Sequence, residues 1–179
     1  INILTHCNAG WLAFVKHGSA TAPIYAAQAA GIPIHVFVGE SRPRNQGTLT
    51  SWEMRKAGVD HTYVVDSAVG HLIQRGEVDI IFTGADRVTM NGDAANKIGT
   101  YLRALAAKES GVPFYINFPS STLDPYSHDG ITEIDIEERD PREVSHVLSE
   151  VEGASVMAQV LDPGTPARNP AFDVTPHGL

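Results

Sequence analysis

Two residues of the sequence could act as an acid, a base or a nucleophile, and each follows an apolar run. Cys7, the single cysteine, stands in the stretch THCNAG, and Asp86 stands in the stretch TGADR after the apolar DIIF. A thiol becomes basic or nucleophilic as the thiolate, when neighbouring groups lower its pKa from about 8.5. A carboxyl group can donate a proton near neutral pH when apolar surroundings raise its pKa. Both positions are therefore candidates for catalysis.

Each position also has a purely structural interpretation. A free cysteine is most often a small buried hydrophobic side chain, and the polar neighbours of Cys7 leave both interpretations open. Asp86 could instead cap the following turn or pair with Arg87. Gly84 and Ala85, however, leave little side-chain bulk before this carboxylate, as a closely approaching ligand requires.

A third group of polar residues lies where the sequence predicts the start of a long helix. Asn96 and Lys97 stand in the stretch GDAANKIGTY, and an amide, an ammonium group and the N–H groups of a helix N-terminus together suit a phosphate. A solvated lysine in the first helical turn explains the same residues equally well. Arg42, Arg44 and Gln46 follow an earlier strand in the stretch ESRPRNQG. Neither nucleotide-binding glycine pattern is present, and the eight histidines form no metal-binding pattern.

Apolar strands and helices alternate along the first two thirds of the chain. Each predicted helix is closed by a glycine or by a polar turn, with Gly58 and Gly111 as the clearest ends. Strands are predicted over residues 1–6, 32–39, 61–66, 78–84 and 112–118, and helices over 19–31, 47–58, 67–77 and 94–111.

This alternation predicts a doubly wound, Rossmann-like α/β fold, in which helices cover both faces of a parallel sheet. Ligands of such folds bind beyond the carboxyl ends of the strands, where the candidate residues converge, so a polar small-molecule pocket is expected there. After Ser120 the chain becomes polar, acidic and rich in proline. Long ordered connections over the sheet are predicted for this part, with a short helix near Glu143–Glu152.

Composition narrows the classes of function. The chain has 179 residues, 42% of them hydrophobic, and a formal net charge of -8; this suits a single domain over residues 1–179. It has no run of basic residues for nucleic acid and no apolar run long enough to cross a membrane. One cysteine excludes an internal disulfide, so a reducing compartment is expected.

Six stretches of the sequence together resemble the methylthioribose-1-phosphate isomerases. In order they are THCNAG, ESRPRNQG, TGADRVTMNGDAANKIGTY, PSSTLD, IEERDP and NPAFDVTP, and they extend from Thr5 to Pro176. The resemblance implies an enzyme of methionine salvage that converts 5-methylthioribose 1-phosphate, or a close 5-deoxypentose 1-phosphate, into the corresponding ketose 1-phosphate. It also implies that no metal or nucleotide cofactor is used.

Carried over by position, the resemblance makes Cys7 and Asp86 the catalytic pair and assigns substrate binding to Gln46, Asn96 and Lys97. It further implies a cytoplasmic homodimer with a small sugar phosphate as its ligand, and no nucleic-acid or membrane partner. Apolar residues such as Trp52 and Met54, in excess of what the core needs, would support the dimer.

The resemblance leaves several alternatives open. Chains of this family carry an additional N-terminal domain that contributes to the same pocket, and a further C-terminal segment. We therefore expect residues 1–179 to be a fragment. Some stretches, such as VDSAVGHLIQRG, are unlike the commonest salvage enzymes. A ribose-1,5-bisphosphate isomerase and a non-catalytic sugar-phosphate-sensing regulatory subunit of the same fold remain alternatives, as do an enediol and a hydride-shift mechanism.

Overall fold

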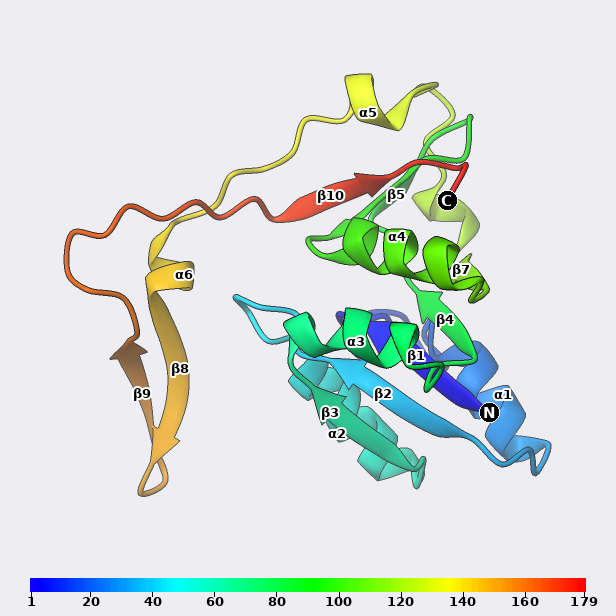
Figure 1. The fold of residues 1–179 in the computed structure, drawn as a ribbon, viewed down its shortest axis with the longest axis horizontal. Coiled ribbons are helices and arrows are strands. Elements are labelled where there is room, and N and C mark those ends of the chain that lie inside the picture. The colour runs from blue at the N-terminus through cyan, green and yellow to red at the C-terminus, as the bar shows by residue number, and fades with distance from the viewer.

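Five parallel strands form the central sheet in the order β3-β2-β1-β4-β7 in the computed structural model, which describes residues 1–179 (Figure 1). The strands are β1 (Asn2–His6), β2 (His35–Gly39), β3 (His61–Val64), β4 (Ile80–Thr83) and β7 (Phe114–Ile116). All five overlap the strands predicted from the sequence. The order is that of a doubly wound sheet, with β1 and β4 at its centre.

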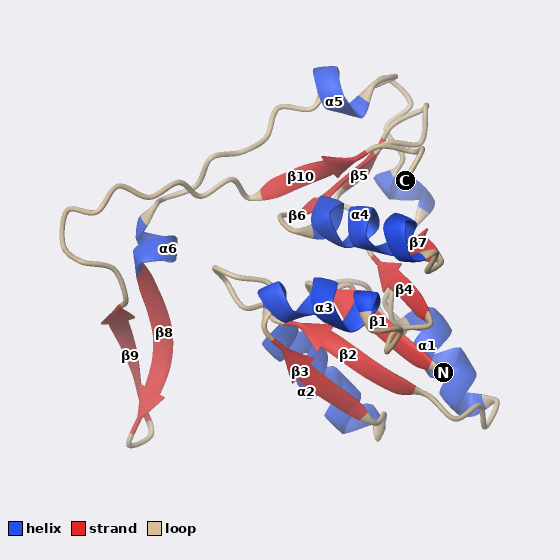
Figure 2. Ribbon diagram, in the orientation of Figure 1, coloured by secondary structure: helices blue, strands red, loops and turns tan.

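Helices cover both faces of this sheet, which confirms the predicted fold class (Figures 1 and 2). One face packs against α1 (Ala22–Ala29) and α2 (Gly47–Ala57), and the other against α3 (Val69–Gln74) and α4 (Thr100–Ser110). A short 3-10 turn, η1 (Asp66–Ala68), precedes α3. Side chains alternate along a strand, so Ile3 joins the core beneath α1 and α2 while Leu4 joins the core beneath α3 and α4. The layer between the sheet and its helices is therefore apolar on both faces.

The order in which successive strands are added to the sheet reverses between β1 and β4, and this opens a crevice at their carboxyl ends. His6 is paired with Thr83 in the parallel register, so the next residues, Cys7 and Gly84, leave the sheet side by side. The stretches THCNAG and TGADR therefore meet at the carboxyl ends of β1 and β4.

The helix predicted over residues 94–111 is wrong at its start. Ala94–Lys97 form strand β6, which pairs with β10 (Phe172–Thr175) and β5 (Arg87–Val88) in a second, three-stranded sheet. Helix α4 begins only at Thr100, because Gly99 takes the left-handed conformation, with φ 98°. Pairing with a strand more than 70 residues away outweighs the helix propensity of the alanines, and sequence periodicity does not report such pairing.

The C-terminal third contains short turns and a hairpin. Short helices η2 (Ser120–Thr122), α5 (Gly130–Glu133) and α6 (Arg142–Ser145) precede strands β8 (His146–Val151) and β9 (Ala154–Gln159). The helix predicted near Glu143–Glu152 is therefore wrong after Ser145. Glu152 and Gly153 both have positive φ, 51° and 81°, which is the conformation of a two-residue hairpin turn. The hairpin projects away from the central sheet (Figure 2).

Two further observations bear on the sequence-based expectations. Met54 is fully buried in the core beneath α1 and α2, so it offers no surplus surface for a dimer, whereas Trp52 is 41% exposed. None of the helices has both the length and the apolar character needed to cross a lipid bilayer.

Candidate functional site

A small cavity of about 110 Å³ lies at the carboxyl ends of β1 and β4. Cys7 enters it from the end of β1, Asp86 from the turn after β4, and Asn96 from β6. Gly84 also lines the cavity, and a Cβ on this residue would lie 2.7 Å from the Cβ of Ala9. The glycine is therefore required for the two strand ends to approach each other this closely.

The backbone of Cys7 is held in a conformation that residues other than glycine rarely adopt. Its φ is 62°, in the left-handed region, which costs about 1 kcal/mol for a residue with a Cβ. The N–H of Cys7 donates to Ser41 Oγ at 2.7 Å, and its carbonyl accepts from Thr50 Oγ1 at 2.6 Å. These two hydrogen bonds hold the left-handed turn and aim the thiol into the cavity.

A buried histidine fixes the hydroxyl that holds Cys7. His6 Nε2 lies 2.9 Å from the carbonyl oxygen of Ile98, which can only accept, so Nε2 carries the proton. Nδ1 is then an acceptor for the hydroxyl of Ser41 at 3.0 Å. Burial, followed by the charge of Arg103, lowers the pKa of His6 to about 3, so the ring is neutral and this arrangement holds at neutral pH.

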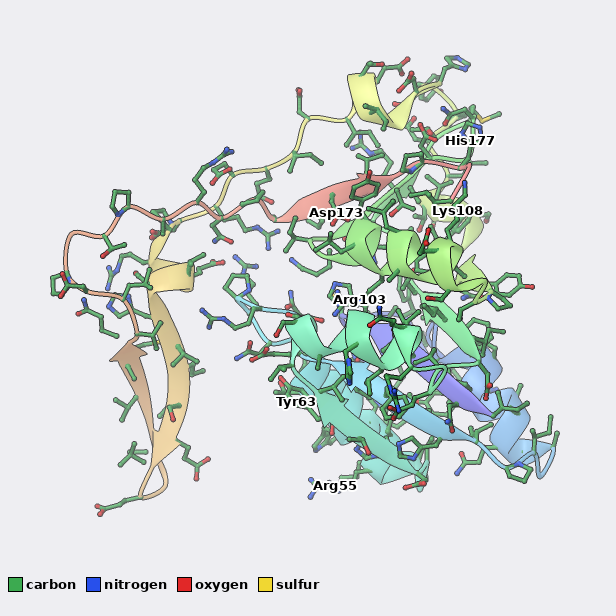
Figure 3. The ribbon with its side chains drawn as sticks, in the orientation of Figure 1. Arg55, Tyr63, Arg103, Lys108, Asp173 and His177 are labelled. Atoms are coloured by element: carbon green, nitrogen blue, oxygen red, sulfur yellow. The ribbon has the colours of Figure 1, made fainter.

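An ion pair anchors Ser41 from the opposite side. Asp66 accepts from Arg103 Nη2 at 2.6 Å, from the N–H of Ser41 at 3.0 Å and from the N–H of Arg42 at 2.8 Å. Burial acts to raise the pKa of Asp66, but these hydrogen bonds and the guanidinium charge outweigh it and lower the pKa. Figure 3 labels Arg103, whose side chain is 4% exposed. The ion pair therefore stays formed at neutral pH and fixes the loop after β2.

A second buried carboxylate shapes the loop after Cys7. Glu53 on α2 is fully buried and accepts from the amide of Asn8 and from the backbone N–H groups of Trp11 and Leu12, each at 3.0 Å. A Cβ on Gly10 would collide with the Glu53 carboxylate. The asparagine and the glycine of the CNAG stretch thus serve the placement of the cysteine rather than the chemistry itself.

The two candidate catalytic groups have raised pKa values. Burial raises the pKa of the Cys7 thiol, and the nearby charge of Lys97 lowers it by a smaller amount. Partial desolvation likewise raises the pKa of Asp86, against the charges of Lys97 and Arg139. Asp86 is exposed to solvent in this chain. The size of its pKa shift therefore depends on how much of its carboxyl group another part of the protein covers. Both directions favour the protonated forms.

The structure corrects the expected setting of Asn96 and Lys97. They lie on β6 and not in the first turn of α4. The N-terminus of α4 is occupied, because the carboxylate of Asp173 accepts from the N–H groups of Gly99 at 2.7 Å and Tyr101 at 3.1 Å (Figure 3). A phosphate could therefore not use these helix N–H groups, and any phosphate contact must come from the side chains.

Asn96 and Lys97 are both buried, at 4% exposure each. The amide of Asn96 donates to Thr100 Oγ1 at 3.0 Å and lines the cavity beside Cys7 and Asp86. Lys97 Nζ donates to the carbonyl of Ala171 at 3.2 Å and lies 4.9 Å from the centre of the Phe172 ring. Burial lowers the pKa of Lys97, and no carboxylate is paired with it. Lys97 does not line the cavity itself, but its charge acts on both Cys7 and Asp86. An unpaired buried ammonium group of this kind suits an anionic ligand.

Two predicted site residues, Gln46 and Lys97, do not line this cavity. Gln46 stands immediately before α2, and its Oε1 is buried without a hydrogen-bond partner. Sequence reasoning in turn missed Ser41 and Arg103, and it placed Asp66 only at the end of a strand, without its role in supporting Cys7. Their signal was weak, because a serine, an aspartate and an arginine on separate elements form no motif along the chain.

Three comparisons with known proteins agree on the relationship. The whole chain, residues 1–179, matches the initiation factor 2 subunit family. The methylthioribose-1-phosphate isomerase of Cereibacter sphaeroides is 60% identical, covering 100% of this chain and 50% of that protein, and that of Rhizobium meliloti is 59% identical with the same coverage. The chain thus spans about half the length of the curated relatives it matches.

Solved structures give the same two classes of relative. The 5-methylthioribose 1-phosphate isomerase of Pyrococcus horikoshii superposes with a TM-score of 0.88 at 42% identity, covering 99% of this chain and 47% of that one. The translation initiation factor eIF-2B subunit delta of A. fulgidus superposes with a TM-score of 0.87 at 38% identity, covering 98% and 48%.

Proposed function

We propose that this chain, which belongs to the initiation factor 2 subunit family, carries the catalytic site of an aldose–ketose isomerase. Its substrate is 5-methylthioribose 1-phosphate or a close 5-deoxypentose 1-phosphate, and its product is the ketose 1-phosphate of methionine salvage. The observation that carries the proposal is that Cys7 and Asp86 line one cavity at the switch point of the sheet. Relatives named for this reaction are 60% and 59% identical.

Asp86 acts as the acid that opens the sugar ring. An aldose locked as a 1-phosphate cannot open spontaneously, so its ring oxygen must receive a proton as the bond from C1 to that oxygen breaks. The raised pKa of Asp86 supports this role, since a protonated carboxyl can donate. Deprotonated Asp86 then accepts the proton of the C2 hydroxyl as the ketone forms. The same residue therefore donates one proton and takes one back in each turnover.

The hydrogen on C2 moves directly to C1 as a hydride, beside a neutral Cys7 thiol. Removal of that hydrogen as a proton would need Cys7 as a thiolate, whereas burial raises its pKa. A bound phosphate dianion would disfavour a thiolate further. We therefore expect product formed in deuterium oxide to carry no solvent deuterium at C1. Deuterium at C1 would favour the enediol route, with Cys7 as the base.

Asn96 and Lys97 bind the 1-phosphate, Lys97 as an unpaired buried cation, and Gln46 binds a sugar hydroxyl through its unpaired amide oxygen. No resident metal or nucleotide takes part. A preceding N-terminal domain covers the exposed Asp86, and the protein works as a cytoplasmic homodimer. Residues 1–179 alone therefore turn over substrate far more slowly than the full-length protein, because an open site lets water weaken each electrostatic contact.

The second candidate is a non-catalytic regulatory subunit, and it is favoured by one observation. The eIF-2B delta subunit of A. fulgidus superposes with a TM-score of 0.87, almost as well as the isomerase of P. horikoshii at 0.88. Overall shape therefore does not separate the two functions, and the paired Cys7 and Asp86 favour the enzyme.

The test is to incubate the full-length protein with 5-methylthioribose 1-phosphate and follow the phosphorus resonance by ³¹P NMR. Appearance of the ketose 1-phosphate, abolished in Asp86→Asn, supports the isomerase. Binding of the sugar phosphate without turnover would instead identify the regulatory subunit.

A further inference from the structure

One peptide group in the turn from β6 to α4, between Ile98 and Gly99, carries the support beneath Cys7. Its carbonyl oxygen lies 2.9 Å from His6 Nε2, and this contact fixes the tautomer of the histidine. His6 Nδ1 then accepts from the hydroxyl of Ser41, whose oxygen accepts from the N–H of Cys7. The orientation of this peptide group therefore decides how the histidine and the serine hold the backbone of Cys7.

The opposite edge of the same peptide group is held by the last strand. The N–H of Gly99 donates to Asp173 Oδ2 on β10 at 2.7 Å, and the N–H and the carbonyl of a planar trans peptide point in opposite directions. The preceding N–H, that of Ile98, donates to the carbonyl of Ala171 at 3.0 Å. The carbonyl cannot turn away from His6 without breaking the hydrogen bond to the carboxylate, and hydrogen bonds to ionised groups are the stronger kind.

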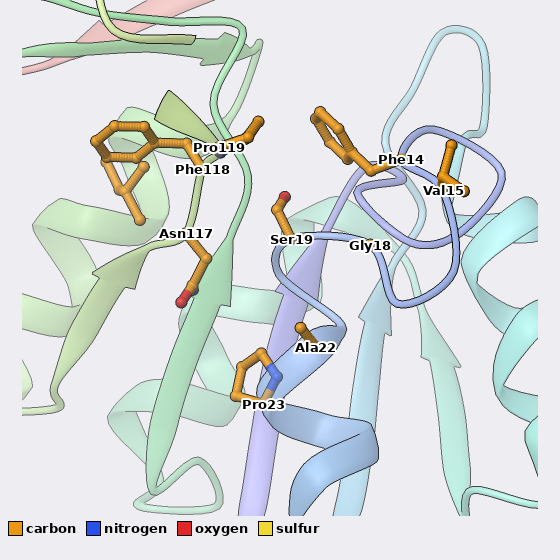
Figure 4. A pocket seen from close by; sticks show the side chains of 10 residues that line it. Phe14, Val15, Gly18, Ser19, Ala22, Pro23, Asn117, Phe118 and Pro119 are labelled. Atoms are coloured by element: carbon orange, nitrogen blue, oxygen red, sulfur yellow. The ribbon is translucent and has the colours of Figure 1, made fainter. Parts of the chain in front are cut away.

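We propose that Asp173 is a positioning residue for Cys7 and acts through the Ile98–Gly99 peptide. The inference rests on the proposed function, since the position of the thiol is read in turnover. Asp173 lines neither the cavity that contains Cys7 nor the pocket beside Phe14 that Figure 4 shows. An effect of this carboxylate on turnover therefore reaches the reaction through hydrogen bonds and not through a contact with the sugar phosphate.

Loss of the carboxylate frees the Ile98–Gly99 peptide to turn its N–H toward His6. The ring of His6 must then accept at Nε2 and donate at Nδ1, which is the opposite tautomer. The hydroxyl of Ser41 loses its acceptor on the ring, so its oxygen no longer faces the N–H of Cys7 in the same direction. The left-handed backbone of Cys7 is held in part by that contact, and the thiol shifts when the contact changes.

Asp173 also caps α4, and a cap alone would stabilise the fold without placing the thiol. Asp129 offers the comparison, because its carboxylate likewise accepts from two backbone N–H groups, those of Ile131 and Thr132, at the start of α5. Neither of these N–H groups belongs to a peptide that contacts His6. Loss of either carboxylate removes a helix cap, but only the loss of Asp173 should reach the thiol.

The experiment is a double-substitution cycle in the full-length protein, with kcat for 5-methylthioribose 1-phosphate as the readout. Asp173→Ala should lower kcat about tenfold with little change in KM, because the thiol is displaced while the phosphate contacts remain. In the Ser41→Ala background the same substitution should change kcat by less than about twofold, because the effects of residues that act as one unit do not add. Asp129→Ala, the matched control, should lower stability to urea by a similar amount and leave kcat unchanged in both backgrounds.

A second readout needs no substrate. Alkylation of Cys7 by iodoacetamide, followed on its peptide by mass spectrometry, should be faster in Asp173→Ala than in the wild type, because the thiol is held less firmly in the cavity. In the double variant it should be no faster than in Ser41→Ala. Asp173→Asn keeps one acceptor oxygen and should show the same pattern at smaller amplitude, which preserves the test if Asp173→Ala does not fold.

Wild-type kcat and wild-type alkylation in both Asp173 variants would overturn the proposal, as would equal fold losses in kcat with and without the hydroxyl of Ser41. Failure of the wild-type protein to convert the sugar phosphate would refute the isomerase, and the alkylation cycle would then decide the role of Asp173 by itself. Additive effects of the two substitutions on alkylation would overturn that role, and coupled effects would support it.

Discussion

Replacing Ser41 by glycine tests the claim that a hydrogen-bond chain from His6 positions Cys7. The substitution removes the hydroxyl that joins His6 Nδ1, at 3.0 Å, to the N–H of Cys7, at 2.7 Å. It leaves two partly or fully buried polar groups unpaired, each at a cost of about 1–3 kcal/mol. Glycine also relieves the positive φ of Ser41, 64°, which returns about 1–2 kcal/mol. The net expected loss of unfolding free energy is about 0–5 kcal/mol, with a middle value of about 2–3 kcal/mol.

The matched control is Lys16→Gly. Lys16 has a φ of 74°, is exposed, and donates no side-chain hydrogen bond, so glycine there relieves strain without cost and should stabilise by up to about 1 kcal/mol. Ser41→Ala keeps the strain and loses the hydroxyl, so it should be less stable than Ser41→Gly.

Urea unfolding of the chain of residues 1–179 measures the stability of all three variants, and steady-state kinetics of the full-length protein measure the consequence for catalysis. Displacement of the thiol by about 1 Å should lower kcat about 10²-fold in Ser41→Gly with a smaller change in KM. Stability and kcat indistinguishable from those of Lys16→Gly would refute the hydrogen-bond chain.

Three further results are expected. Gly10→Ala should destabilise the chain to urea by about 1–3 kcal/mol, because its Cβ collides with the buried Glu53 carboxylate; a neutral outcome would mean that this loop adapts freely. Asp86→Asn should raise stability at pH 7 but not at pH 3, because the raised folded-state pKa makes ionisation of Asp86 oppose folding only above about pH 3.9; equal gains at both pH values would contradict this. Alkylation of Cys7 by iodoacetamide should be slow at pH 7 and slower still in Lys97→Met, because Lys97 lowers the thiol pKa; faster alkylation in the variant would show that the lysine does not act on the thiol.

The sequence predicted the fold and the meeting of Cys7 with Asp86 because both depend on local pattern. Buried strands of a parallel sheet are continuous apolar runs, and the residues after them must reach one edge. The start of α4 was missed because the β6 segment, residues 94–97, pairs with Phe172–Thr175, a contact that helix propensity does not encode. The capping of α4 by Asp173 was missed for the same reason.

The support beneath Cys7 was also out of reach of sequence reasoning. Ser41 interacts with His6 across 35 positions and Arg103 with Asp66 across 37, and each of these residues is common elsewhere as an ordinary turn or surface residue. Only the three-dimensional arrangement shows that they bear on one backbone amide. Strand β8 was mistaken for part of a helix because Glu143–Ser145 lie in one, and the hairpin turn at Glu152–Gly153 lacks the usual asparagine or aspartate.

The most direct test of the proposed site is the kcat of Cys7→Ala and Asp86→Asn in the full-length protein with saturating 5-methylthioribose 1-phosphate. The proposal predicts that each variant loses about 10²–10⁴-fold in kcat with little change in KM, because both groups act on the reacting atoms and not on the phosphate. Asp129→Asn is the matched control, since Asp129 only caps α5 and asparagine caps equally well; its kcat should equal that of the wild type. Wild-type kcat in either Cys7→Ala or Asp86→Asn would contradict the assignment of this cavity as the catalytic site.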